Sequence, residues 1–306
     1  MSIKQPSFFV VGAPKAGTTA LCKYLARHPE IFIPQRKELN YFNKGSIRTS
    51  LVKTLEEYLC FFAEGAGKIC GEGSTVYLRS PNAAREIYNF NPNAKIIIML
   101  REPVALLRSF HSQLLWNGSS EDIEDFQTAI LAEENRRKGL QIPEKCHNPQ
   151  VLFYSEIVDF TEQIERYLEY FSWQQINIIL FDDFTKNTAE EYKKTLMFLN
   201  ADESFATHFN KINPKKKVKS KFIQELYKRP PEKILKIGKY FLPIPREQRK
   251  KLLNAIKDYL QQFNQKEIKN HRQVNSDFLV ELNRKFSSEI DRLSELINRD
   301  LSHWKK

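Results

Sequence analysis

The chain has 306 residues, of which 41% are hydrophobic and 28% are charged, and its formal net charge is +11. This composition is typical of a folded globular protein and excludes a disordered chain. The apolar run Phe8 to Val11 is too short for a signal peptide or a membrane span, which predicts a soluble, cytoplasmic protein without stable membrane insertion. The four cysteines form no CxxC pair and have no His pattern at metal spacing, so we expect reduced thiols and no metal site.

Strand and helix patterns alternate along the first 212 residues. Ser7–Val11 is a short apolar run that ends at Gly12 and predicts a buried strand, and Thr18–Arg27 follows it as a helix. Further strands are expected at Ile31–Ile33, Ile69–Cys70, Ala94–Leu100 and Ile176–Phe181, and further helices at Leu51–Phe62, Asn82–Tyr88, Pro103–Leu114, Glu156–Phe171 and Ala189–Leu199. This alternation predicts an α/β fold with a central parallel sheet flanked by helices.

The last third of the chain has a different pattern. After about Asn213 the strand patterns stop, and the final helix, Phe278–Asn298, has an apolar stripe that indicates core packing. We therefore expect one domain over residues 1–306, with a core of about 1–212 and a helical, basic C-terminal extension of about 213–306.

The positive charge is concentrated in that extension. Residues 211–272 contain 19 Lys and Arg against 5 Asp and Glu, a net charge of +14, which leaves −3 for the rest of the chain. Such a segment could bind nucleic acid, an anionic membrane or an acidic ligand, or it could be a solvated helical surface.

The turn between the first strand and the first helix, Gly12 to Thr19, has the composition of an anion-binding loop. A helix N-terminus presents backbone N–H groups and a favourable dipole, and Gly17 permits close backbone approach. Lys15 adds a cation, while Thr18 and Thr19 add hydroxyl donors. The domain is therefore P-loop-like.

The loop differs from that of a nucleotide kinase. The glycine spacing matches GxxxxGK[ST], but Thr18 stands where the kinase pattern has lysine. A kinase also needs an acidic residue that helps to hold Mg²⁺, whereas the most apolar strand here ends in Arg101. Arg101 and Ser109, eight residues later on the next helix, predict a second anion site at the carboxyl edge of the sheet, although a surface arginine and an incidental serine are the alternative.

At this point the chain resembles the PAPS-dependent sulfotransferase family, whose donor is 3′-phosphoadenosine 5′-phosphosulfate (PAPS). The similar segments are FFVVGAPKAGTTAL, IIIMLREPVALLRSF, HPEIFIPQRKELNYF, EGSTVYLRSP, YSEIVDFTEQIERYLEYFSWQQINIILFDDF and DLSHW. They cover nearly the whole chain in order, and they are most similar to the heparan-type and bacterial branch. The first two correspond to the family's 5′-phosphosulfate loop and 3′-phosphate motif.

The resemblance implies a role for each matching residue. It makes Lys15 a catalytic residue that stabilises the bridging oxygen and the sulfuryl group, and Glu38 the general base. It also implies binding of PAPS and of the product PAP without a metal. The implied nucleotide-binding residues are Lys15, Ala16, Gly17, Thr18, Thr19, Arg101, Ser109, Lys217 and Lys219. For Lys217 and Lys219 a solvated lysine cluster is an equal alternative, and for Glu38 the alternative is a surface carboxylate paired with a neighbouring cation.

The sequence also departs from the family pattern. Gly73 stands where the family has a lysine, which leaves open whether Lys37 replaces it. Glu72 is then a second base or, as we expect, a structural carboxylate. The family's small-molecule branch uses a histidine base, but His111 lies in another segment and is expected to pack or to lie at the surface. Tyr154 is expected to pack in the core, with the lining of the acceptor cleft as the alternative. The acceptor pocket is expected from Asn117–Asn148 and the C-terminal helices.

Three functions compete. The first is transfer of a sulfuryl group from PAPS to a hydroxyl of a carbohydrate, lipid or other small molecule. A P-loop nucleotide kinase or hydrolase is the second, and it lacks the lysine and the acidic metal ligand it would need. The third is a protein that binds nucleic acid or an anionic membrane through residues 211–272, where few aromatics are interleaved for base stacking. We therefore expect an acceptor with a hydroxyl group as the partner, and no nucleic acid.

Overall fold

The structure is a computed structural model that describes residues 5–44, 52–118, 120–205, 207–209, 216–218, 265–267 and 275–306. The chain forms two compact units. The larger unit comprises Met1–Leu115, Ser119–Ile212 and Val274–Lys306, and the smaller one comprises Trp116–Gly118 and Asn213–Gln273.

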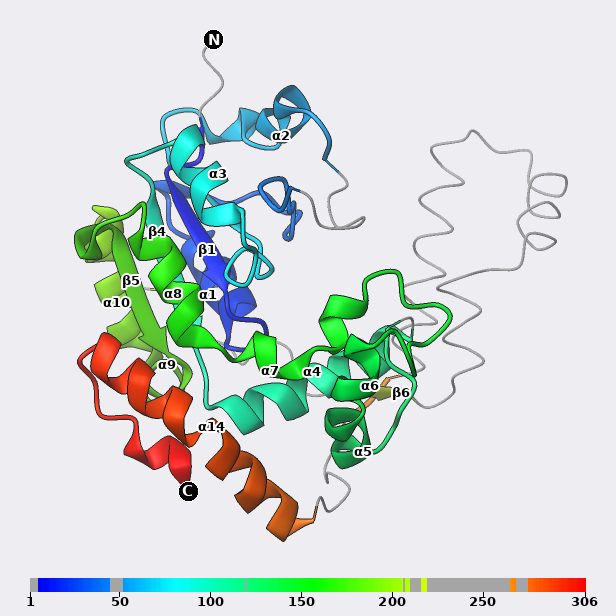
Figure 1. Ribbon diagram of the computed structural model, residues 1–306. Coiled ribbons are helices and arrows are strands. Elements are labelled where there is room, and N and C mark those ends of the chain that lie inside the picture. Colours follow the sequence, from blue (N-terminus) through cyan, green and yellow to red (C-terminus); the bar gives the residue numbers. More distant parts are fainter. Residues whose placement is uncertain are drawn as a thin grey trace, which may run out of the picture. The chain divides into compact units, whose positions relative to one another are not determined.

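The larger unit contains a five-stranded sheet in the order β2-β3-β1-β4-β5, with all neighbouring strands parallel (Figure 1). The strands are β1 (Phe8–Gly12), β2 (Ile31–Phe32), β3 (Ile69–Gly73), β4 (Lys95–Leu100) and β5 (Ile176–Leu180). Every residue of β1 is buried, and β4 is buried after its first residue. Strands covered on both faces need such continuous apolar runs, so the predicted parallel α/β fold is confirmed.

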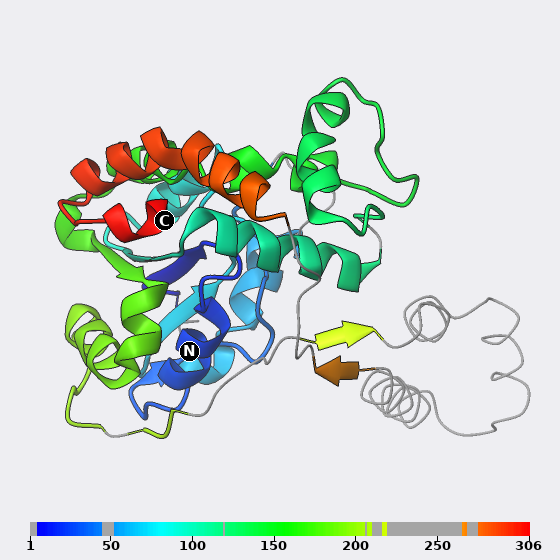
Figure 2. The ribbon, with the colours of Figure 1, turned by 90° about the horizontal axis from the view of Figure 1, so that it is seen from below.

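Helices cover both faces of the sheet, as Figure 2 shows. On one side α1 packs against α10, and on the other α8 packs against both α3 and α14. The helices of the larger unit are α1 (Thr18–Leu25), α2 (Leu55–Cys60), α3 (Ala83–Phe90), α4 (Pro103–Asn117, whose end belongs to the smaller unit), α5 (Phe126–Leu131), α6 (Glu133–Arg137), α7 (Tyr154–Ile157), α8 (Phe160–Leu168), α9 (Phe181–Lys186), α10 (Thr188–Leu199) and α14 (Ser276–Leu296).

The strand order places a topological switch point at β1. From β1 the chain moves to β2 and then β3 on one side of the sheet, and β4 and β5 lie on the other side. The connections after β1 and β4 therefore diverge at the carboxyl edge. In open parallel sheets, ligands bind at such a switch point because the separating connections leave room between them.

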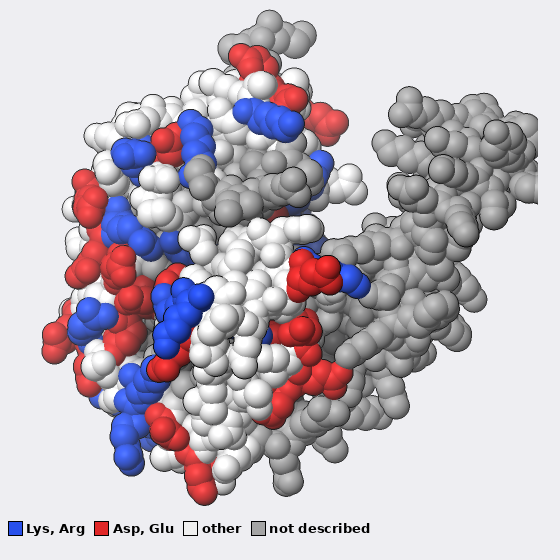
Figure 3. All heavy atoms as spheres, turned by 45° about the vertical axis from the view of Figure 1, so that its right-hand side comes forward, with Lys and Arg blue, Asp and Glu red and all other residues white. Residues whose placement is uncertain are grey.

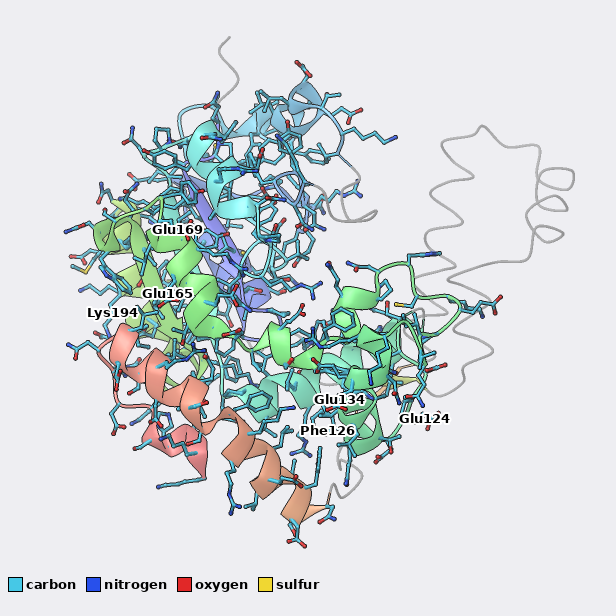
Figure 4. All side chains as sticks on the ribbon, in the orientation of Figure 1. Glu124, Phe126, Glu134, Glu165, Glu169 and Lys194 are labelled. Carbon is cyan, nitrogen blue, oxygen red and sulfur yellow. The ribbon has the colours of Figure 1, made fainter. Side chains whose placement is uncertain are left out.

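The surface of α8 follows the helical period. Thr161, Ile164 and Tyr167 are buried, whereas Glu165 and Glu169 lie on the exposed side of the helix (Figure 4). Figure 3 shows that Lys and Arg side chains are intermixed with Asp and Glu on the face it presents. This mixture fits the small net charge outside residues 211–272.

The end of the chain belongs to the larger unit. Glu289 of α14 accepts hydrogen bonds from the backbone N and Oγ1 of Thr161, at 2.7 and 2.8 Å. Trp304 Nε1 donates to Asp182 Oδ2 at 2.7 Å. Leu282, Phe286 and Leu293 of α14 are buried in the core, so the core contact expected for the last helix is confirmed. The expected domain bounds stay a prediction.

Three local expectations were wrong. Strands do not stop after Asn213, because β6 (Lys216–Val218) and β7 (Gln265–Glu267) form an antiparallel pair in the smaller unit. The helix expected at Glu156–Phe171 is broken into α7 and α8. Phe181 begins α9 instead of ending β5, because Asp182 and Asp183 place negative charge in a helical first turn.

Candidate active site

The loop between β1 and α1 ends in an uncapped helix N-terminus. Gly17, the residue before the helix, has φ 95° and makes no side-chain capping hydrogen bond, and Lys15 has φ 64°. The backbone N of Ala20 donates to Gly17 O at 2.8 Å, whereas the N–H groups of Thr18 and Thr19 precede the first intrahelical acceptor, and the helix dipole adds positive potential there. This is the geometry of an anion site.

Neighbouring elements hold this loop in place. The backbone N of Ala13 donates to Met99 O of β4 at 2.6 Å, and Ala16 is fully buried. A Cβ atom on Gly17 would lie 3.3 Å from both Met99 Cε and Phe181 Cδ2. Glycine thus serves two needs at this position, a positive φ and close packing against β4 and α9.

Arg101, directly after β4, contacts the same loop. Its Nη1 atom donates to Lys15 O at 3.0 Å, and its guanidinium carbon lies 4.6 Å from the centre of the Phe181 ring. Burial lowers the pKa of this guanidinium. This hydrogen bond brings Arg101 against the loop that contains Lys15, and anion binding at either residue stays a prediction.

The other residues expected at the 3′-phosphate are less constrained. Ser109 is half-buried on α4. Lys217 lies in β6, of which only the backbone is described and which belongs to the smaller unit. Lys219 lies outside the described residues. The nucleotide contacts of all three remain predictions.

Glu38 is fixed at the carboxyl end of β3. Its backbone has φ 60°, and its N–H donates to Gly73 O at 3.0 Å. Its carboxylate accepts from the backbone N of Thr75 at 2.9 Å and from Thr75 Oγ1 at 3.2 Å. The side chain remains 39% exposed, so the carboxylate is oriented by the protein and still accessible to a ligand.

Lys37 links this carboxylate to the anion loop. Its Nζ atom donates to Thr18 Oγ1 at 2.9 Å and to Thr19 Oγ1 at 3.2 Å. The same atom lies 3.7 Å from Glu38 Oε1. The base predicted from the sequence, the neighbouring lysine and the threonines of the loop therefore lie in one connected group.

Beneath Glu38 lies a buried carboxyl group, Glu72, which is 2% exposed. It accepts from the hydroxyl of Tyr58 at 2.6 Å, from that of Tyr77 at 3.0 Å, and from Ser74 Oγ. Burial raises the pKa of Glu72 to about 7, although the three hydroxyl donors act in the opposite direction. This burial is what we expect of a structural carboxyl group, and that role for Glu72 stays a prediction.

The same hydroxyl groups hold the segment that follows Glu38. Ser74 Oγ accepts from the backbone N of Asn40 at 3.0 Å, and the Tyr77 hydroxyl accepts from that of Phe42 at 3.2 Å. Glu72 therefore positions this segment through side chains to which the sequence analysis gave no role. Their only signal was the spacing of polar residues in EGSTVY.

His111 and Tyr154 are buried, as expected for packing residues. His111 Nε2 lies 2.8 Å from Ile123 O. The Tyr154 hydroxyl donates to Glu121 Oε2 at 2.6 Å, and Arg136 donates to both oxygens of Glu121, at 2.8 and 2.6 Å. This ion pair anchors the segment that holds α5 and α6, where Figure 4 marks Glu124, Phe126 and Glu134.

Among the described residues, no group of three or more His, Cys, Asp or Glu side chains could hold a metal ion. No described helix is both long enough and apolar enough to cross a membrane.

Comparison with known proteins gives a consistent match. The family model described as "Sulfotransferase domain" matches residues 5–241. The membrane-associated sulfotransferase kil1 of Dictyostelium discoideum is 35% identical over 114 residues, covering 36% of this chain and 24% of that protein. The bifunctional heparan sulfate N-deacetylase/N-sulfotransferase 1 of Caenorhabditis briggsae is 27% identical over 225 residues, covering 69% of this chain and 24% of that protein. The chain thus spans about a quarter of the length of these two relatives.

A solved structure shares the fold. The crystal structure of a sulfotransferase from Alicyclobacillus acidocaldarius superposes with a TM-score of 0.72 at 24% identity, covering 99% of this chain and 100% of that one. Its sheet and helices support the architecture described above.

Proposed function

The chain belongs to the sulfotransferase domain family, and on that premise we propose that it transfers the sulfuryl group of PAPS to a hydroxyl group of an acceptor. The acceptor is a carbohydrate or another hydroxylated small molecule or lipid. The names of the relatives, which include a heparan sulfate N-sulfotransferase, support the carbohydrate class.

The donor side of the reaction belongs to the β1–α1 loop and Arg101. The N–H groups of the first turn of α1, together with Thr18 and Thr19, would bind the 5′-phosphate. Lys15 would neutralise charge on the bridging oxygen as the S–O bond breaks. Arg101 and Ser109 would bind the 3′-phosphate, with Lys217 and Lys219 as further candidates.

The acceptor side belongs to Glu38. A bond forms between the acceptor oxygen and sulfur while the bond from sulfur to the bridging oxygen breaks and PAP leaves. The acceptor hydroxyl must lose its proton, and a carboxylate within hydrogen-bond reach can take it. The hydrogen bonds from Thr75 hold the Glu38 carboxylate in one orientation.

A single observation carries this proposal. Lys37 connects the carboxylate of Glu38 to the two threonines at the start of α1. The proposed base and the N-terminus of α1 thus both lie within reach of one ammonium group, and such proximity supports direct transfer between two bound substrates. Neither alternative function is favoured: position 18 is threonine, and the family match is to sulfotransferases.

Nucleotide binding provides the first test. We expect PAP to raise the melting temperature without added metal and by more than ATP with Mg²⁺ or duplex DNA does. Calorimetry should then detect binding of PAP. A protein that binds neither PAP nor PAPS is not a PAPS-dependent sulfotransferase.

Two variants test the assignment of roles during transfer from ³⁵S-labelled PAPS to an extract of candidate acceptors. Lys15→Ala should nearly abolish label transfer, because the leaving oxygen loses its cation. Glu38→Gln should lower turnover about 10²- to 10⁴-fold while PAP binding stays nearly unchanged. A fully active Glu38→Gln enzyme would rule out Glu38 as the base.

A further inference from the structure

The space above Gly73 is occupied by the side chain of Lys37. A Cβ atom on Gly73 would lie 2.8 Å from Lys37 Cε and 2.8 Å from Cys22 Sγ. Any larger residue at position 73 would therefore displace the lysine or the thiol. The absence of a side chain on Gly73 is what lets Lys37 cross the end of β3 and reach α1.

The ammonium group of Lys37 lies in a place that is unfavourable without an anion. It donates to two hydroxyl groups at the N-terminus of α1, where the helix dipole is positive. Among the described residues, its ion-pair partner is Glu38 at 3.7 Å, longer than a direct hydrogen bond. A cation at the positive end of a helix is stabilised when a further negative group binds beside it.

We infer that Lys37 is a second catalytic cation, whose ammonium group hydrogen-bonds the transferring sulfuryl group between the donor loop and Glu38. This rests on the proposed function. Lys37 keeps its protons and donates hydrogen bonds throughout, while the acceptor proton goes to Glu38. The family pattern has a lysine at position 73 on β3. In this chain the positive charge comes instead from Lys37, in the loop before Glu38.

The contacts also predict how Lys37 acts on its neighbours. The ammonium group touches Thr18, Thr19 and Glu38 at once. It therefore fixes the distance between the proposed base and the proposed phosphate site. Its effect should be larger on the rate of transfer than on binding of PAP, which lacks the sulfuryl group.

The primary test compares Lys37→Met with the control Lys23→Met. Methionine keeps most of the aliphatic chain above Gly73 and removes the charge, while Lys23 is an exposed lysine in the last turn of α1. Lys37→Met should lower kcat on the order of 100-fold, as loss of one preorganised donor does, with a smaller effect on PAP affinity. Lys23→Met should behave as the wild type.

Outcomes of this comparison are separable. A folded Lys37→Met enzyme with wild-type kcat overturns the inference, and so does a variant whose loss of activity is matched by equal losses of PAP affinity and thermal stability. A wild-type protein that binds PAP and transfers no label to any acceptor or to water contradicts the proposed function instead.

A double-mutant cycle tests whether Gly73 and Lys37 share one space. Gly73→Ala should lower kcat about tenfold in the wild type, because the new methyl group would lie 2.8 Å from Lys37 Cε and displace the lysine. In the Lys37→Ala background only the close approach to Cys22 Sγ remains, so the same methyl group should have a much smaller effect on kcat. Equal effects in both backgrounds would show that the two positions act independently, and would overturn the inference.

Discussion

Two buried carboxyl groups, Glu72 and Glu121, are 2% and 4% exposed but are held by different partners. Glu121 receives two hydrogen bonds from Arg136 and one from Tyr154. Glu72 receives its hydrogen bonds from hydroxyl groups. Burial raises the pKa of both carboxyl groups, so any difference between their pKa values comes from their hydrogen-bond partners.

The partners set opposite pKa directions. Burial raises the pKa of Glu121, but the hydrogen bonds from Arg136 and Tyr154 outweigh burial, and the net pKa lies below the ordinary value. The hydroxyl donors of Glu72 do not outweigh burial, so its pKa rises to about 7. The segment that bears the proposed base is therefore held by a carboxyl group whose pKa is about 7, whereas the segment around α5 and α6 is held by an ion pair.

The largest effect should come from breaking the ion pair. Glu121→Gln leaves Arg136, whose side chain is fully buried, without a counter-charge. We expect the free energy of unfolding to fall by about 3–5 kcal/mol. Urea unfolding at neutral pH measures this, with Arg137→Met, which breaks a partly exposed pair to Glu133, as the control. If Glu121→Gln lowers the free energy of unfolding no more than Arg137→Met does, the buried ion pair does not stabilise the fold as proposed.

The second effect is a pH dependence of stability that should have opposite signs at Glu72 and Glu121. Below pH 4.5 Glu72 is protonated in both the folded and the unfolded state; between pH 4.5 and about 7 it ionises first in the unfolded state, so folded stability falls as pH rises. The total fall is about 3 kcal/mol, from 1.36 kcal/mol per pKa unit.

Glu72→Gln should remove this slope. Relative to the wild type, the variant should gain stability between pH 4.5 and 7, as measured by urea unfolding across that range. Glu121→Gln should show the reverse, because a lowered pKa stabilises the folded state above pH 4.5 and this contribution is lost as pH falls. Parallel curves for the two variants would contradict the assignment.

The smallest effect separates the tyrosines. Tyr58→Phe removes one of three hydroxyl donors from Glu72 and should cost about 1–2 kcal/mol. Tyr154→Phe leaves Glu121 its two bonds from Arg136 and should cost less, about 1 kcal/mol or below. Both hydroxyl groups lie 2.6 Å from the carboxylate that accepts their hydrogen bond. A difference in the loss of unfolding free energy therefore comes from the other donors to each carboxylate and not from the hydrogen-bond distance.

The positions of the main strands along the chain, and of the turn between β1 and α1, could be predicted because their signals are local. FFVVG and KIIIML are continuous apolar runs, and Gly12 and Pro103 mark where each strand gives way to a turn or helix. Sequence position alone also located Arg101 after the strand next to β1. The break at residues 158–159 between α7 and α8 could not be found, because the apolar periodicity continues across it.

The contacts of the candidate site were largely beyond prediction. Lys37 reaches Thr18 because Glu38 takes a positive φ and because Gly73 has no side chain, and neither condition can be recognised from one sequence. The role of Glu72 in holding Asn40 and Phe42 requires knowledge of how β3 lies beside the loop before α2. Such long-range contacts follow from tertiary packing and not from spacing.

The larger unit is discontinuous in sequence, because its last two parts end at Ile212 and begin again at Val274. Its returning part is fastened by the hydrogen bonds between Glu289 and Thr161 and between Trp304 and Asp182, and by the packing of α14 on α8. These links do not depend on an intact backbone between the two crossings. A single cut within residues 213–273 would therefore leave two fragments able to recognise each other, which makes this stretch a natural place for split-protein complementation.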